Sequence, residues 1–82
     1  MLSMEKRSRF APGEIVEKAV AFFGPGGLGL EVAEQERCCA RFKGAGGFVF
    51  VQAEDVEGAR GAKVNIEGRE WEIQIKEFLG TL

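Results

Sequence analysis

The chain has 82 residues and a formal net charge of −2; 45% of the residues are hydrophobic and 29% are charged. These values are typical of one small globular domain and exclude a disordered chain. They also exclude long-range attraction to nucleic acid or anionic lipid, and no apolar run reaches the roughly 20 residues that span a bilayer. We expect a single domain over residues 1–82, with residues 1–4 as a candidate disordered extension, and a cytoplasmic location.

The N-terminal part predicts a short edge strand over residues 5–10, followed by an amphipathic helix over residues 12–23. Pro12 favours the first helical turn because its missing N–H would have no partner there. Glu14 favours the positive end of the helix dipole. The apolar side chains share one broad face, and the glycine and proline that follow end the helix.

From residue 28 onward apolar and polar residues alternate, which is typical of half-buried strands. Residues 28–33 and 37–43 predict a β-hairpin. Residues directly opposite each other share a face, so the apolar residues of the two strands pair only if the loop has an odd number of residues, such as residues 34–36. The expected core pairs are Leu28 with Phe42, Leu30 with Ala40, and Val32 with Cys38. Cross-strand charge pairing is expected of Glu31, Glu34 and Glu36 with Arg37 and Arg41.

The second half predicts a glycine-rich turn, a strand at residues 48–54 that is apolar on both faces and therefore central, and a short strand at residues 63–67. Residues 69–79 fit both a helix and a strand. We favour the helix because it gathers more large apolar side chains on one face, with Trp71 on that buried face and Ile73 nearly opposite. The expected helical stripe consists of Trp71, Ile75, Phe78, Leu79 and Leu82.

These elements predict an α+β domain in which an antiparallel sheet of four to five strands packs two helices on one face, in the order β-α-β-β-β-β-α. This order resembles that of TATA-binding-protein-like and helix-grip folds over most of the chain. Residues 47–51 and 68–72 also resemble segments of small bacterial proteins. The resemblance implies a fold and no particular activity.

Two glycine-rich segments resemble known ligand-binding motifs. Residues 24–29 match G-x-G-x-x-G, but here a helix precedes the motif and a strand follows it, the reverse of the dinucleotide-binding arrangement. Residues 43–50 partly match the first signature of RNA-recognition motifs, but Ala45 and Gly47 occupy positions where aromatic rings would stack on bases. We expect neither dinucleotide nor nucleic-acid binding.

The chemistry-bearing residues do not form a recognisable active site. The sequence has no histidine, and its carboxylates fall at polar positions where solvated side chains are expected. The only cysteines, Cys38 and Cys39, are adjacent. Because neighbours in a strand point to opposite faces, we expect two reduced thiols and no disulfide. We assign no catalytic, cofactor-binding or metal-binding residue and expect a protein that is not an enzyme.

The sheet supplies the best functional hypothesis. Two helices cover only one face, so the apolar strand at residues 48–54 leaves aromatic side chains on the other. We expect a non-catalytic interaction or structural module that self-associates as a homodimer through this face. The alternative is a small module that binds a hydrophobic or anionic small molecule on this same face or in a cleft between the sheet and the helices, with Arg41 or Lys43 holding the anionic group. The candidate interaction surface consists of Cys39, Arg41, Lys43, Phe48 and Phe50.

Overall fold

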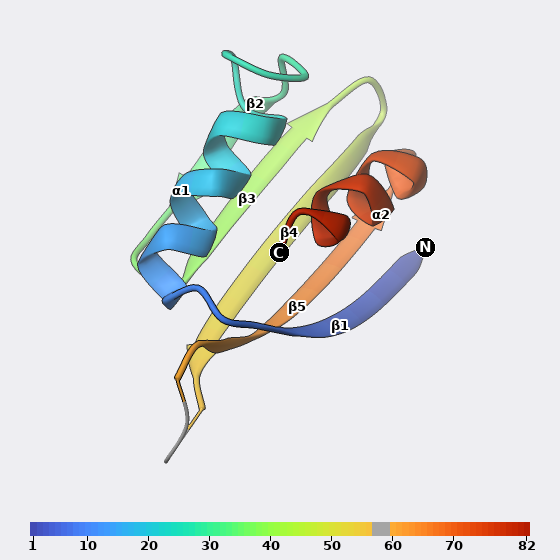
Figure 1. Ribbon diagram of the computed structural model, residues 1–82. Coiled ribbons are helices and arrows are strands. Elements are labelled where there is room, and N and C mark those ends of the chain that lie inside the picture. The colour runs from blue at the N-terminus through green and yellow to red at the C-terminus, as the bar shows by residue number, and fades with distance from the viewer. Residues whose placement is uncertain (57–59) are drawn as a thin grey trace.

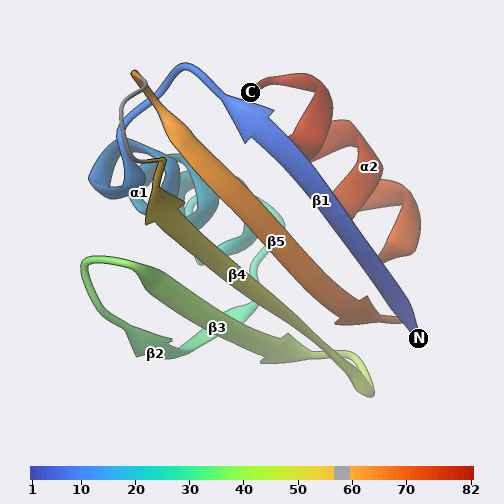
Figure 2. The ribbon, with the colours of Figure 1, turned by 90° about the horizontal axis from the view of Figure 1, so that it is seen from below.

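The computed structural model describes residues 1–56 and 60–82, which form an antiparallel sheet with the helices on one of its faces (Figures 1 and 2). The sheet has five strands in the order β1-β5-β4-β3-β2. The predicted fold class and element order are confirmed. The elements are β1 (Leu2–Ser8), α1 (Pro12–Phe23), β2 (Glu31–Gln35), β3 (Cys39–Gly44), β4 (Gly47–Asp55), β5 (Ala62–Arg69) and α2 (Glu72–Gly80).

Helix α1 has the predicted bounds, begins with Pro12 in its first turn, and packs against β3 and β4. Its last residue, Phe23, is fully buried and joins the two helices to the sheet. The ring centroid of Phe23 lies 5.2 Å from that of Phe78 on α2 and 5.5 Å from that of Phe42 on β3. These are ordinary distances for tilted aromatic pairs. The buried side chains of α1 are Ile15, Val16, Ala19 and Phe23.

The C-terminal segment is a helix, as predicted, and its outward residue Ile73 is 69% exposed. The predicted position of Trp71 on that helix is wrong. Strand β5 runs on to Arg69, and the chain then turns sharply through Glu70, which has φ 72°. Trp71 therefore precedes α2 and lies half-buried at the edge of the core, where its Nε1–H donates to the carbonyl of Gly44 at 3.2 Å.

Strand β1 begins at Leu2, earlier than the predicted edge strand, and pairs with β5 along its whole length. Its side chains alternate, so that Lys6 and Ser8 lie on the side that carries α2. The Lys6 ammonium donates to the carbonyl of Leu79 at 2.7 Å, and the Ser8 hydroxyl donates to that of Leu82 at 3.3 Å. The N-terminal strand is thus tied to the C-terminal end of α2, where a cation complements the helix dipole.

The predicted register of the β2–β3 hairpin is wrong. Strand β2 begins at Glu31, after Leu28, and Val32 lies opposite Phe42. The turn is an even, two-residue turn, because Glu36 and Cys39 exchange backbone hydrogen bonds of 2.7 and 3.4 Å across it. A bulge between Val32 and Glu34 compensates for the even turn, since one extra residue returns Val32 to the core face.

The β3–β4 hairpin follows the predicted facing. Val49 lies opposite Phe42 and Val51 opposite Ala40, and all four side chains are fully buried under the helices. The turn residue Ala45 and the glycine after it both have positive φ values, 49° and 79°. This is the feature of type I′ turns, whose twist matches that of the flanking strands. Phe48 and Phe50 consequently point to the face without helices.

Candidate functional site

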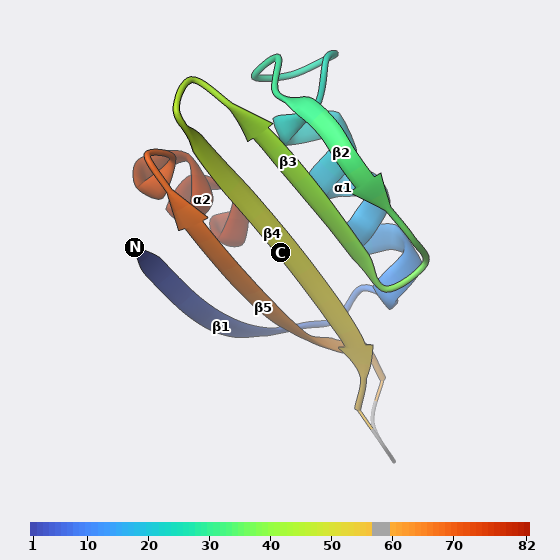
Figure 3. The same cartoon turned by 180° about the vertical axis from the view of Figure 1, so that it is seen from behind.

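The face of the sheet opposite the helices is the first candidate site. Figures 1 and 3 show both helices on one side of the sheet and bare strands on the other. In the described sheet, Arg41 lies directly opposite Phe50 and Lys43 directly opposite Phe48, with Cys39 one alternation further along β3. The structure therefore brings the five predicted residues onto one face, which we call the uncovered face; Cys39 is buried there, whereas the other four are exposed or half-buried.

The aromatic residues of the uncovered face are partly covered by its cations. Phe48 and Phe50 are half-buried, and the Arg41 guanidinium lies 4.4 Å from the centroid of the Phe50 ring. This distance is within the range of a cation–π contact. The Lys43 ammonium lies 3.7 Å from a carboxylate oxygen of Glu31. Both cations thus lie beside groups within the chain, so the face is a mixed aromatic and charged surface.

Charge is arranged asymmetrically around β4 in one row of the uncovered face, whereas the neighbouring row, Lys43–Phe48–Arg69, has a cation on both sides. Phe50 pairs with Arg41 on one side and with Glu67 on the other, so the three residues form one row across the sheet. Both charged members of this row are exposed. Beyond Glu67, Glu5 of β1 lies 3.4 Å from Lys63 of β5. The row therefore places a positive charge on the β3 side of an aromatic ring and a negative charge on the β5 side.

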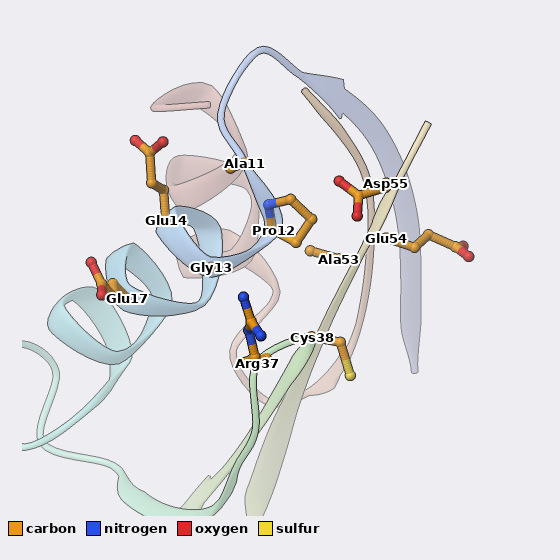
Figure 4. Close-up of a pocket in the computed structure, with 10 residues that line it drawn as sticks. All are labelled: Ala11, Pro12, Gly13, Glu14, Glu17, Arg37, Cys38, Ala53, Glu54 and Asp55. Atoms are coloured by element: carbon orange, nitrogen blue, oxygen red, sulfur yellow. The ribbon is translucent and has the colours of Figure 1, made fainter. Parts of the chain in front are cut away.

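An open depression of about 830 Å³ lies between the start of α1 and the β2–β3 turn (Figure 4). In Figure 4 the Arg37 guanidinium points into it from the turn, and the Asp55 carboxylate points inward from the end of β4. The carboxylates of Glu14, Glu17 and Glu54 point away from it. Carboxylates outnumber the single guanidinium around its rim, so Arg37 is the one cationic partner that the lining offers to an anionic group.

The β2–β3 turn overturns the prediction for the cysteines, because Cys38 and Cys39 form a disulfide. The prediction assumed that both residues lie in a regular strand. Instead Cys38 is in the turn and Cys39 begins β3, so their sulfurs lie on the same side. A carboxylate oxygen of Glu36 and the two sulfurs all lie within 4.8 Å of one another. Sequence reasoning missed this cluster, because the cluster depends on the two-residue turn at Arg37 and Cys38, which hydrophobic alternation does not distinguish from an odd loop.

Comparison of the chain with protein-family models, with curated proteins and with solved structures found no match in any of the three. Within residues 1–56 and 60–82, neither helix is long and apolar enough to cross a bilayer. The uncovered face, the depression and the disulfide turn are therefore interpreted from their own chemistry.

Proposed function

We propose that this protein is a non-catalytic interaction module that forms a homodimer through the uncovered face. The observation that carries the proposal is the row in which Phe50 lies between Arg41 and Glu67. Such a row is complementary to a copy of itself. Aromatic surface that a single chain leaves half-open favours burial against a partner, because removing apolar area from water is favourable.

The row also selects the symmetry of the dimer. A twofold axis parallel to β4 keeps each residue at its level along the strand and exchanges the β3 and β5 sides. Arg41 of one copy then faces Glu67 of the second copy, and the Phe50 rings meet at the centre. A twofold axis that crosses the strands at the Phe50 row would instead place Arg41 against Arg41 and Glu67 against Glu67 of the second copy, which is repulsive at both positions. The axis along β4 brings like charges together only where Lys43, which lies beside Glu31 of its own chain, faces Arg69 of the second copy.

Charge reversal tests this arrangement. Arg41→Glu places like charges against Glu67 of the second copy, and Glu67→Arg does the same against Arg41, so each single variant should shift the protein to monomer. The double variant exchanges the two charges and should restore the dimer. Sedimentation velocity across a micromolar concentration series measures the monomer–dimer distribution of all three variants and the wild type.

Matched controls come from the exposed side of α2. Lys76→Glu and Glu77→Arg make charge changes of the same size on residues that lie far from the uncovered face. Both should dimerise like the wild type. A wild type that stays monomeric at tens of micromolar, or a double variant that stays monomeric when the wild type dimerises, would contradict the proposal.

The alternative function, binding of a small molecule, is supported by the depression beside α1 and its inward-pointing Arg37. A ligand that fits both polar groups pairs a carboxylate or phosphate with Arg37 and a donor with Asp55. A thermal-shift screen of metabolites and fatty acids tests it. A ligand at one hundred times its Kd stabilises the folded state by ~2.7 kcal/mol, and Arg37→Gln should remove the shift.

A further inference from the structure

We propose that the β2–β3 turn binds a thiophilic divalent metal ion once its disulfide is reduced, with Cys38 Sγ, Cys39 Sγ and a Glu36 carboxylate oxygen as ligands. The inference goes beyond the homodimer and does not depend on it. It rests on the juxtaposition of three ligand-bearing residues at one turn and on the position of the bond that joins two of them, in which Cys38 is exposed and Cys39 is buried.

The three ligand atoms are close enough to share one ion. Zinc takes thiolate sulfur at about 2.3 Å and carboxylate oxygen at about 2.0–2.2 Å, so ligand atoms around one tetrahedral zinc lie about 3.3–3.8 Å apart. In the structure all three atoms lie within 4.8 Å of one another. Glu36 and Cys38 are exposed, so their side chains can rotate toward a shared ion without disturbing the core.

The disulfide at this position has little structural use. A disulfide stabilises a fold mainly by closing a long loop of the unfolded chain, whereas this bond joins residues one apart in sequence. Neither cysteine belongs to the large core cluster between the sheet and the helices. Cys38 is also exposed at the turn, where a reductant can reach the bond. A bond that closes no loop and is accessible is suited to reversible opening.

Opening the bond and loading the ion are separate, balanced steps. A dithiol reductant transfers two electrons and two protons to the bond, which yields thiols at Cys38 and Cys39 and a cyclic disulfide in the reductant. The metal ion then displaces one proton from each thiol and binds the two thiolates, and the ionised Glu36 carboxylate binds without proton release. The reverse step needs an oxidised disulfide reagent, which accepts two electrons from the two thiolates and leaves as a dithiol after taking up two protons; the re-formed Cys38–Cys39 disulfide offers no thiolate, so the ion is released.

The ligand set defines the class of ion. Two thiolates select soft or borderline ions such as Zn²⁺ and Cd²⁺ over Mg²⁺ and Ca²⁺, which require oxygen ligands. Three protein ligands leave the fourth tetrahedral position to water. The site borders the depression, because Cys38 lines both, but in Figure 4 the Cys38 sulfur points away from the depression while the Arg37 guanidinium points into it.

Zn²⁺ is the probe for the test. The full chain is reduced with dithiothreitol, freed of reductant without air, and titrated with Zn²⁺ against a chromophoric chelator. We expect one Zn²⁺ per chain, and binding at least about a hundredfold weaker for the oxidised chain. Cys38→Ser and Cys39→Ser should each abolish tight binding. Glu36→Gln should weaken it at least about tenfold, because losing a direct ligand costs no less than losing an outer-shell partner.

Glu34→Gln is the matched control, because it removes an exposed carboxylate from the same strand, outside the cluster, and should bind Zn²⁺ like the wild type. Circular dichroism establishes that each variant is folded, and Cd²⁺ charge-transfer absorption reports thiolate ligation directly. Equal Zn²⁺ affinity in the reduced and oxidised chains would overturn the proposal. The proposal would also be overturned if two chains shared one Zn²⁺ and the Glu36→Gln variant bound Zn²⁺ with wild-type affinity, because the Glu36 carboxylate would then not be a ligand.

Discussion

Gly68 of β5 lies against the side chain of Ile75 on helix α2, and Gly68→Ala is therefore a sharp test of how α2 packs on the sheet. A Cβ at residue 68 would lie 2.2 Å from Ile75 Cδ1 and 3.2 Å from the carbonyl oxygen of Phe48. Ile75 is fully buried, so its side chain has no free space to enter. The clash would push α2 away from β5, and we expect the variant to lose about 1–3 kcal/mol of unfolding free energy.

A second substitution makes the prediction specific. Ile75→Val removes the Cδ1 atom that the new methyl would meet, at a cost of about 0.5–1.5 kcal/mol on its own. In the double variant the added methyl partly fills the vacated space. The total loss should therefore be smaller than the sum of the single losses by at least about 0.5 kcal/mol, the lower limit of coupling between residues in contact.

Urea unfolding followed by Trp71 fluorescence and by circular dichroism measures all four chains of this cycle. Gly80→Ala is the control, because a Cβ at residue 80 meets nothing within 4 Å, and we expect no loss of stability. If Gly68→Ala is as stable as the wild type, or if the double variant loses the full sum, α2 does not rest on β5 through this contact.

Three further substitutions test turns and edges of the same core. In the Ala45→Asn variant, a residue that tolerates positive φ replaces an alanine that has φ 49°. We expect the free energy of unfolding, measured by heat or urea, to rise by about 0.5–1 kcal/mol. A fall would show that the turn does not have this conformation. Trp71→Phe keeps an aromatic ring against the core but removes the hydrogen bond from Nε1–H to the Gly44 carbonyl. The unfolding free energy, followed by circular dichroism, should fall by about 0.5–1.5 kcal/mol. Ile73→Ala should change it by less than about 0.5 kcal/mol, because Ile73 is 69% exposed.

The elements that the sequence predicts best are those in which one local pattern fixes the answer. Helix α1 begins at Pro12 and ends before a glycine and a proline. Its apolar residues fit the helical repeat and do not also fit the alternation of a strand. Strand β4 is apolar on both sides because Val49 and Val51 enter the core while Phe48 and Phe50 remain on the uncovered face. The alternation of side chains along one strand is enough to place those residues, so the uncovered face could be predicted.

The elements that sequence reasoning places wrongly depend on contacts between distant parts of the chain. Leu2 and Met4 belong to β1 only because β5 provides backbone partners more than 60 residues away. Trp71 leaves the helical stripe because β5 is longer than its apolar residues suggest, so that the chain has to turn at Glu70 before α2 can begin. The hydrophobic periodicity of one segment does not reveal how long its partner strand is, nor does it reveal which residue turns the chain with a positive φ.

The β2–β3 hairpin explains both the largest error and the most informative site. An odd loop and an even turn with a bulge place Val32 on the core face equally well, so hydrophobic alternation cannot distinguish them. The choice matters for the cysteines, because an odd loop leaves Cys38 and Cys39 on opposite faces of a strand, whereas the even turn puts their sulfurs together beside Glu36. The same bulge that keeps the core intact therefore permits the even turn, and the even turn brings Cys38 beside Cys39, the first residue of β3.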